Sequence, residues 1–122
     1  MNIASTNGNQ KCITKQELED LIRKSSLIPY DDIWISEKET GYPCLAILIN
    51  GNFACVHYFL SDSADVWQSV GGYDQDVTFK VTGEAPSVMP GDCVIPLDTA
   101  IKCAKEFFDT HQRPNCIEWE EL

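Results

Sequence analysis

The feature that most constrains the fold of this chain is a pair of apolar segments separated by Asn50-Gly51. Residues 44–49 and 52–59 have the length of strands, and Asn-Gly between two apolar runs is a strong signal for a β-hairpin turn. Both faces of the predicted hairpin are apolar, whereas a strand with one solvated face alternates apolar and polar residues. We therefore expect the hairpin to lie in the centre of a sheet. Its faces would both be covered, or one would be covered and the other used for binding.

The turn also predicts the register of the hairpin. If Asn50 and Gly51 are the two turn residues, Cys44 pairs with His57. Side chains alternate between the two faces of a strand. One face then carries Cys44, Ala46, Leu48, Phe53, Cys55, His57 and Phe59, and the other carries Leu45, Ile47, Ile49, Ala54, Val56 and Tyr58.

Two helices are predicted on either side of these strands. Thr14-Lys-Gln-Glu17 is a capping box, in which the Thr14 hydroxyl accepts a hydrogen bond from the Glu17 amide. It begins a helix of about three turns. The second helix ends before Pro114, which cannot continue it. The inward residues of the two helices are Leu18, Leu21 and Ile22 in the first, and Leu97, Ala100, Ile101, Ala104, Phe107 and Phe108 in the second.

The remaining segments complete an α+β pattern. Residues 33–36, 66–70 and 77–81 predict short strands, residues 86–92 a turn-rich loop, and residues 1–10 a flexible end. We expect a single domain over residues 1–122, with two main helices and a largely antiparallel sheet of about five to six strands.

The C-terminal part carries the one specific resemblance. The second helix runs into Arg113-Pro114 and a short alternating strand with Trp119, and a strand-like Cys93-Val-Ile-Pro96 precedes it. This ending resembles a family of bacterial immunity proteins, the first-numbered Imm family of antidotes to polymorphic toxins. A second segment, residues 39–45, looks like the central strands of that family. Within the family, the resemblance is to antidotes of DNA cytidine deaminase toxins.

The resemblance implies a cytoplasmic antidote that binds the catalytic domain of a cognate toxin delivered between neighbouring bacteria. In this reading Trp119 is a core residue packed against the second helix. Its replacement by alanine would then cost about 3–5 kcal/mol, as large aromatic truncations in cores do. We also expect Trp34 in the core. The paired carboxylates Asp31 and Asp32 are expected to be solvated.

The charge of the chain limits its possible partners. Nineteen acids against nine bases give a net charge of −10, so phosphates of nucleic acids and anionic membranes would be repelled. A basic protein partner fits better, although acidity alone can serve solubility. The N-terminus lacks the pattern of a signal peptide and no apolar run has the length of a membrane span, so a cytoplasmic location is expected.

Catalysis and metal binding have little support. His57 shares a hairpin face with Cys44 and Cys55, so a Cys–His nucleophile pair or a zinc site is conceivable, but a core position is the simpler interpretation. The spacing of the six cysteines lacks Cys-x-x-Cys, and in a reducing compartment we expect free thiols. No glycine-rich phosphate loop is present, and no cofactor is expected.

The acids concentrate in one segment. Between residues 61 and 98, seven acids face a single base, Lys80, and account for more than half of the net charge. Aromatic residues are interleaved with them, which is typical of protein–protein contacts with a basic groove. Alternatively, the aromatics point inward and the acids only solvate turns. The predicted partner-binding residues are Asp62, Asp65, Trp67, Tyr73, Asp74, Asp76, Glu84 and Asp92.

Three functions remain open from the sequence. The first is an immunity protein that occludes the active site or substrate path of a toxin, best a nuclease or nucleobase deaminase, because a toxin acting on nucleic acid needs a basic substrate surface. The second is a small acidic regulatory or adaptor domain that binds a basic protein segment. The third is a Cys/His hydrolase.

Overall fold

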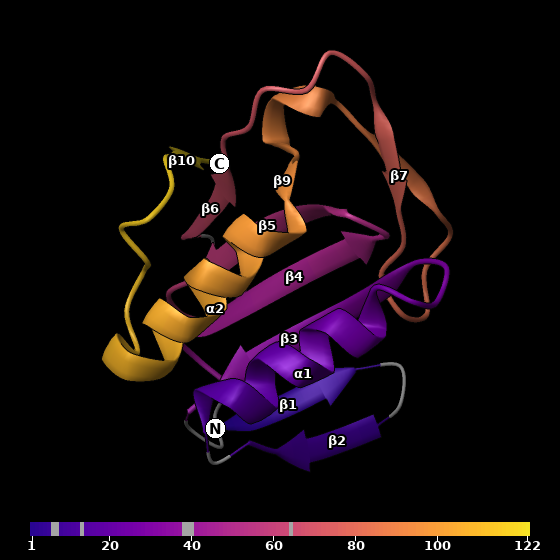
Figure 1. Ribbon diagram of the computed structural model, residues 1–122. Helices are drawn as coiled ribbons and strands as arrows, with labels where there is room; N and C mark the ends of the chain where they lie inside the picture. Colours follow the sequence, from indigo (N-terminus) through magenta and orange to yellow (C-terminus); the bar gives the residue numbers. More distant parts are fainter. Residues whose placement is uncertain (6–7, 13, 38–40, 64) are drawn as a thin grey trace.

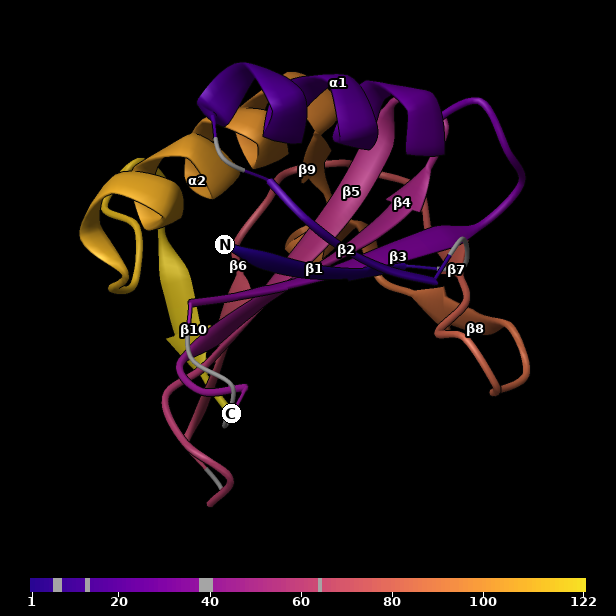
Figure 2. The same ribbon diagram turned by 90° about the horizontal axis from the view of Figure 1, so that it is seen from below.

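The computed structural model describes residues 1–5, 8–12, 14–37, 41–63 and 65–122. Within them, the backbone forms an antiparallel sheet of eight strands, a separate two-stranded ribbon and two α-helices. Both helices cover one face of the sheet, and the ribbon lies toward the opposite face (Figures 1 and 2). This is the predicted α+β architecture, with more strands than the five or six expected.

The strands follow the order β10-β6-β5-β4-β3-β1-β2 across the sheet, and β9 pairs with β5. The bounds are β1 Asn2–Ser5, β2 Gly8–Lys11, β3 Asp31–Ser36, β4 Cys44–Asn50, β5 Phe53–Phe59, β6 Val66–Ser69, β9 Ile95–Pro96 and β10 Trp119–Glu121. The ribbon pairs β7, Val77–Phe79, with β8, Ser87–Met89. The helices are α1, Lys15–Ser25, and α2, Leu97–Thr110, and a short 3-10 turn, η1, covers Gly91–Cys93.

β4 and β5 form the predicted central hairpin, in a register two residues away from the prediction. Cys44 pairs with Phe59 instead of His57, and the turn consists of Gly51 and Asn52. Gly51 has a φ of +59°, which glycine adopts without steric cost. A shift of two residues leaves every side chain on its face, so the predicted division of the two faces is confirmed.

One hairpin residue explains the shifted register. The sequence pattern placed Asn50 in the turn, whereas its side-chain amide donates to the Thr78 carbonyl oxygen in the ribbon, at 2.8 Å. Asn50 is therefore the last paired residue of β4, opposite Phe53. A long-range hydrogen bond thus selects one of two turns that the local sequence allows.

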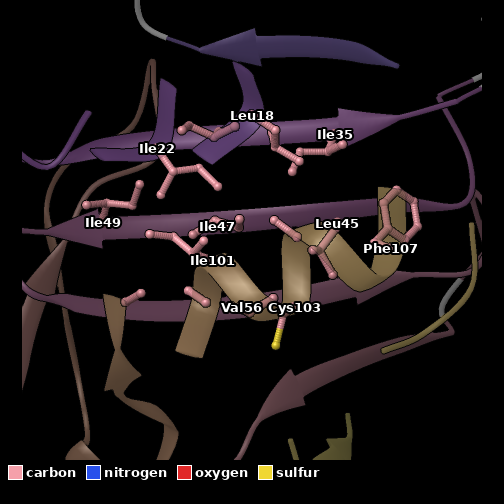
Figure 3. Close-up of a cluster of buried hydrophobic side chains, with 14 of the residues drawn as sticks. Leu18, Ile22, Ile35, Leu45, Ile47, Ile49, Val56, Ile101, Cys103 and Phe107 are labelled. Atoms are coloured by element: carbon pink, nitrogen blue, oxygen red, sulfur yellow. The ribbon is translucent and has the colours of Figure 1, made fainter. Parts of the chain in front are cut away.

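The main core lies between the helices and the sheet (Figure 3). The apolar residues of β4 and β5 predicted on one face point into it, together with the inner faces of both helices. Its fully buried members include Leu18, Ile22, Ile33, Ile35, Leu45, Ile47, Ile49, Val56 and Phe107. A second, smaller cluster covers part of the other face and contains Leu48, Cys55, Phe79, Cys93 and Val94. Both faces of the central hairpin are thus covered at one end of the sheet.

The helices begin and pack as their sequences predict. Thr14 caps α1 and its hydroxyl accepts from the Glu17 amide at 3.1 Å, as expected from the capping box; Ile13, before the cap, lies outside the described residues. Ion pairs join the exposed sides of the two helices, among them Lys15 with Asp109 at 3.0 Å. Arg23 and Lys105 also make ion pairs in this layer. Three of the nine basic residues are therefore used within the helix layer.

Several strands of the structure were not predicted from the sequence. Residues 1–10 were predicted to be flexible, whereas the structure has β1 paired with β3, and β2 at the edge of the sheet. These short strands bury a single residue, Ile3, so they show little apolar alternation. The predicted strands on either side of Gly71-Gly72 lie in different sheets, because β6 lies between β5 and β10 and β7 pairs with β8 in the ribbon. Residues 86–92, predicted as a loop, contain β8 and the start of η1.

The C-terminal segment packs as predicted in outline and less deeply than predicted. Trp119 is half-buried, and its ring lies 6.4 Å from that of Tyr58, which in turn meets Phe107 at 6.3 Å. The Trp119 indole N–H donates to the Pro114 carbonyl oxygen at 2.7 Å. The residue therefore joins the segment after α2 to the edge of the main core, and it is not a fully buried core residue.

This position lowers the expected cost of removing the ring. Trp119→Ala should reduce the free energy of unfolding by about 2–3 kcal/mol, below the 3–5 kcal/mol of a fully buried aromatic, because part of the ring is already solvated. Urea denaturation of the two proteins measures the difference. A mutant as stable as the wild type would show that the C-terminal segment contributes nothing to the core.

Candidate functional site

The eight residues predicted to contact a partner do not form a single patch. Asp62 and Asp65 lie on the turn between β5 and β6, Tyr73, Asp74 and Asp76 on the loop between β6 and β7, Glu84 in the turn of the ribbon, Asp92 in η1, and Trp67 in β6. Figure 2 shows the β5–β6 turn at the bottom of the molecule, well separated from the ribbon at the right. Each group therefore has to be considered separately.

Trp67 points toward the helix side of the sheet. It pairs with Tyr58, and the two ring centroids are 5.9 Å apart. The guanidinium of Arg113 lies 4.8 Å from the centre of the Trp67 ring, which is cation–π geometry. Trp67 is half-buried against the main core, so for this residue the inward alternative fits the structure better than an exposed anchor.

The second predicted aromatic, Tyr73, helps to form a hollow. At this end of the sheet, the loop after β6 meets the start of β5 and the segment before β3. The Tyr73 ring meets Phe53 edge-on, with centroids 5.1 Å apart. Together with Tyr30, Asp74 and Asp76, this pair lines a hollow of about 650 Å³. The structure thus joins three of the predicted residues in one site.

The hollow is aromatic and acidic. Its lining contains Asp74 and Asp76 but no lysine or arginine, and among the described residues neither aspartate has a basic partner within ion-pair distance. Phe53 leaves 37 % of its surface exposed. The structure therefore offers a negatively charged recess with uncovered aromatic surface, which suits a cationic side chain.

A second candidate surface is the part of the sheet that neither the helices nor the ribbon cover. Trp34 was predicted in the core, but it lies on the face opposite the helices, half-buried and stacked on Phe59 with centroids 5.5 Å apart. Trp34 lines two adjoining hollows there, of about 570 and 300 Å³. Glu84, from the ribbon turn, lines a third with His57, of about 490 Å³.

The buried carboxylate of Asp32 fixes this surface, and Asp31 is buried as well, so the prediction that Asp31 and Asp32 are solvated is wrong. Asp32 accepts hydrogen bonds from the Trp34 indole N–H at 2.8 Å and from the Thr82 hydroxyl at 2.5 Å. It thereby ties β3 to the loop that follows β7. Asp31 accepts from the hydroxyl of Ser25, at the end of α1. Both carboxylates are buried because these donors satisfy them.

The Cys–His combination does not form a nucleophilic site. The His57 ring is hydrogen-bonded to the Gln68 side-chain oxygen at 2.9 Å, and burial lowers the pKa of His57. Burial raises the pKa of the Cys44 thiol to about 11, whereas an activated cysteine needs a lowered pKa. In the described part of the chain, no three His, Cys, Asp or Glu side chains lie close enough together to hold a metal ion.

Comparison with known proteins identifies the family. The sequence model of the family described as "Immunity protein Imm1" matches residues 12–121 of this chain. The chain is also 33% identical over 91 residues, covering 70% of each sequence, to a protein of Burkholderia cenocepacia (strain H111) named "Double-stranded DNA deaminase immunity protein". The chain belongs to the Imm1 family of immunity proteins. The resemblance noted in the C-terminal segment is therefore confirmed, including its similarity to antidotes of DNA deaminase toxins.

Membership of the Imm1 family decides between the functions that the sequence left open. This is an immunity protein, which binds a cognate toxin protein and neutralises it. The matched range includes the acidic loops, the hollow beside Tyr73 and Trp34 itself, whereas the residues of β1 and β2 that also line the hollow at Trp34 precede it. Within the described residues, neither helix is long and apolar enough to cross a membrane.

The six cysteines of this Imm1 protein are free thiols, as predicted, and five of them are buried. Cys116 is exposed. In the native protein, a disulfide-exchange reagent such as Ellman's reagent should therefore modify one thiol rapidly at pH 8 and the other five only after unfolding. The colour yield with time measures this, and Cys116→Ser should remove the rapid phase alone. Rapid modification of several thiols would show that the buried cysteines are more accessible to solvent than the structure indicates.

Sequence reasoning missed three residues that shape the candidate surfaces. Trp34 was assigned to the core because it lies within an apolar strand, and only the pairing of the strands shows which face it occupies. Phe53 follows the hairpin turn and was counted with its apolar face. Tyr30 has a φ of +55°, which is unusual for a residue other than glycine and gave no signal in the sequence.

Proposed function

We propose that the toxin neutralised by this Imm1 protein is a nucleic-acid-modifying enzyme, and specifically a DNA deaminase. The similarity to an immunity protein named for a double-stranded DNA deaminase carries the proposal. The charge of the chain agrees with it. An enzyme that acts on DNA presents a basic surface to phosphates, and a protein with a net charge of −10 is attracted to that surface.

Inhibition would proceed by occlusion. An acidic protein bound over the active site or along the DNA path blocks access of the substrate and needs no chemistry of its own. The immunity protein would therefore inhibit one toxin molecule at a time and remain unchanged.

The distribution of charge suggests which side faces the toxin. In the helix layer, Glu19, Asp98 and Asp109 form ion pairs with Lys15, Arg23 and Lys105. The loops between β5 and β7 carry acids that have no such partners among the described residues. We propose that the contact surface includes the loop side of the molecule, with Asp62, Asp65, Tyr73, Asp74, Asp76, Glu84 and Asp92, and that Trp67 supports it from the sheet.

Co-expression tests the proposal. A toxin domain from a gene next to that of this protein, expressed in a bacterial host, should reduce the viability of the host and raise its frequency of C-to-T mutations, and the immunity protein should reverse both effects. The two proteins should also elute together in size-exclusion chromatography as a complex with one copy of each. A neighbouring toxin that kills without mutating DNA would refute the deaminase assignment. A toxin that this protein neither binds nor neutralises would refute the pairing.

A further inference from the structure

We propose that the hollow lined by Tyr30, Phe53, Tyr73, Asp74 and Asp76 receives an arginine side chain of the toxin. The identity of the partner rests on the function proposed above. The preference of the hollow for a guanidinium cation rests on its own chemistry and can be tested without any toxin.

The hollow is large enough to receive a side chain of a partner protein. Its volume of about 650 Å³ lies within the range of sites that enclose small ligands. Two apolar residues that shortly precede Tyr30 in the sequence are also exposed, since Leu27 leaves 82 % and Ile28 leaves 38 % of their surfaces uncovered. Apolar groups around a recess can exclude water from a contact at its centre.

The aromatic pair supplies the surface that binds a cation. Phe53 and Tyr73 meet edge-on, with an angle of 84° between their planes, so the ring that presents its edge keeps both of its faces free of the other ring. A guanidinium over an aromatic face is attracted by the ring quadrupole, and arginine adds planar stacking that lysine lacks. The Arg113–Trp67 contact shows the same geometry within this chain.

The two acidic residues determine which charge a group bound in the hollow should carry. Asp74 and Asp76 line the hollow, and no lysine or arginine does. An anion would be repelled, and a neutral group would leave the two carboxylates without a partner at a contact surface. A guanidinium can instead donate two parallel hydrogen bonds to one carboxylate while its plane lies against a ring. Arginine thus uses both components of the lining.

The hollow is held by long-range contacts. The Asn50 side chain ties the end of β4 to Thr78 of the ribbon at 2.8 Å, and the Tyr73 amide donates to the Gly91 carbonyl oxygen at 3.2 Å. Both contacts fix segments that line the hollow before a partner arrives. A recess that is already formed loses less conformational entropy when it binds a partner. Such preformed contacts are typical of the few residues that supply most of the binding energy of an interface.

The acids of the β5–β6 turn provide a matched control. Asp62 and Asp65 are exposed like Asp74 and Asp76. Neither of them lines the hollow that contains Phe53 and Tyr73. They can attract a basic partner at long range, yet they offer no recess for its side chain. The two aspartate pairs therefore separate insertion of a side chain from general attraction of charge.

The first test uses the immunity protein alone. N-acetyl-arginine amide is titrated into the 15N-labelled protein, with the uncharged isostere N-acetyl-citrulline amide as the matched probe. We expect saturable shifts of the amide signals of residues 73–78 and Phe53 with the arginine probe only. Tyr73→Ala should weaken them at least about threefold. Equal shifts with both probes, or shifts of the same size at Asp62 and Asp65, would overturn the proposal.

The second test uses a toxin domain from a gene next to that of this protein. Tyr73→Ala, and the double variant Asp74→Asn with Asp76→Asn, should each increase the dissociation rate of the complex at least about tenfold. The double variant Asp62→Asn with Asp65→Asn should change that rate less than about twofold. Melting temperatures establish that the variants are folded, and Tyr73→Phe should dissociate like the wild type because it keeps the ring.

The outcomes distinguish the two proposals. If the wild type binds the toxin and the variants of the hollow dissociate no faster, the toxin pairing stands and the arginine subsite is refuted. If the arginine probe binds in the hollow but the protein leaves the toxin active, the subsite stands and the proposed partner is refuted.

Discussion

Replacing Gly71 by alanine is expected to lower the free energy of unfolding by about 3 kcal/mol or more, because the new methyl group has no space. A Cβ atom at this position would lie 1.7 Å from the Val94 carbonyl oxygen, which is backbone and cannot turn away. The Gly71 amide donates to the Asp92 carbonyl oxygen at 2.6 Å. This close approach joins the loop after β6 to η1 and thereby closes the second core cluster over the sheet.

The neighbouring glycine is the control for this prediction. A Cβ atom at Gly72 meets no other atom within 4 Å, so Gly72→Ala should change the stability by less than about 0.5 kcal/mol. Urea denaturation of both variants measures the difference. Equal stabilities would show that the loop after β6 does not pack against η1 as described, and the hollow beside Tyr73 would then lack its support.

The second large effect is expected on association with the toxin. Replacing Asp62, Asp65, Asp74 and Asp76 together by asparagine should slow association by about tenfold or more at low salt, because unpaired surface charges steer a basic partner. The dependence of the rate on salt concentration should become flatter. Folding should change little, since each exposed charge is worth less than about 0.5 kcal/mol. Stopped-flow mixing at several salt concentrations measures both the rate and its slope.

Charge removal from the helix layer provides the comparison. Asp20→Asn with Asp109→Asn removes two carboxylates from the side that we place away from the toxin, and it should slow association less than either pair of loop aspartates. In cells, the four-residue variant should protect less well than the wild type against the same toxin. An unchanged rate and salt slope would show that the acidic loops are only solvated. The contact surface would then be sought on the open face around Trp34 and Phe59.

Local patterns predicted the parts of the fold that local interactions determine. The capping box at Thr14 and the apolar period of α2 require only neighbours along the chain, and both are found. The two faces of the central hairpin follow from the alternation of its side chains. Its register does not, because the amide of Asn50 is used by the ribbon, which comes later in the sequence.

The missed features depend on contacts between distant segments. Asp32 was expected in solvent because two adjacent carboxylates are costly to bury, and Thr82, fifty residues away, provides donors that make burial possible. Residues 1–10 looked unstructured because β1 and β2 are stabilised mainly by pairing across the sheet. Trp34 could be recognised as a surface residue only when the pairing of β3 with β4 was known.

The candidate site was predictable in composition and unpredictable in arrangement. Acids interleaved with aromatics in residues 61–98 indicated a contact surface for a basic partner. The fold places Trp67 toward the helices and Tyr73 in a recess, although both lie in the same acidic segment. Phe53 and Tyr30 complete that recess from other parts of the chain, which no pattern within the segment could show.

Occlusion of a deaminase is tested most directly by an assay of DNA deamination with a toxin domain from a gene next to that of this protein. Cytosine-to-uracil conversion in double-stranded DNA is measured while the immunity protein is titrated against a fixed toxin concentration. If the immunity protein occludes the substrate path tightly, deamination should fall linearly and stop at one immunity protein per toxin. Undiminished deamination in the presence of a molar excess of the folded immunity protein would contradict occlusion.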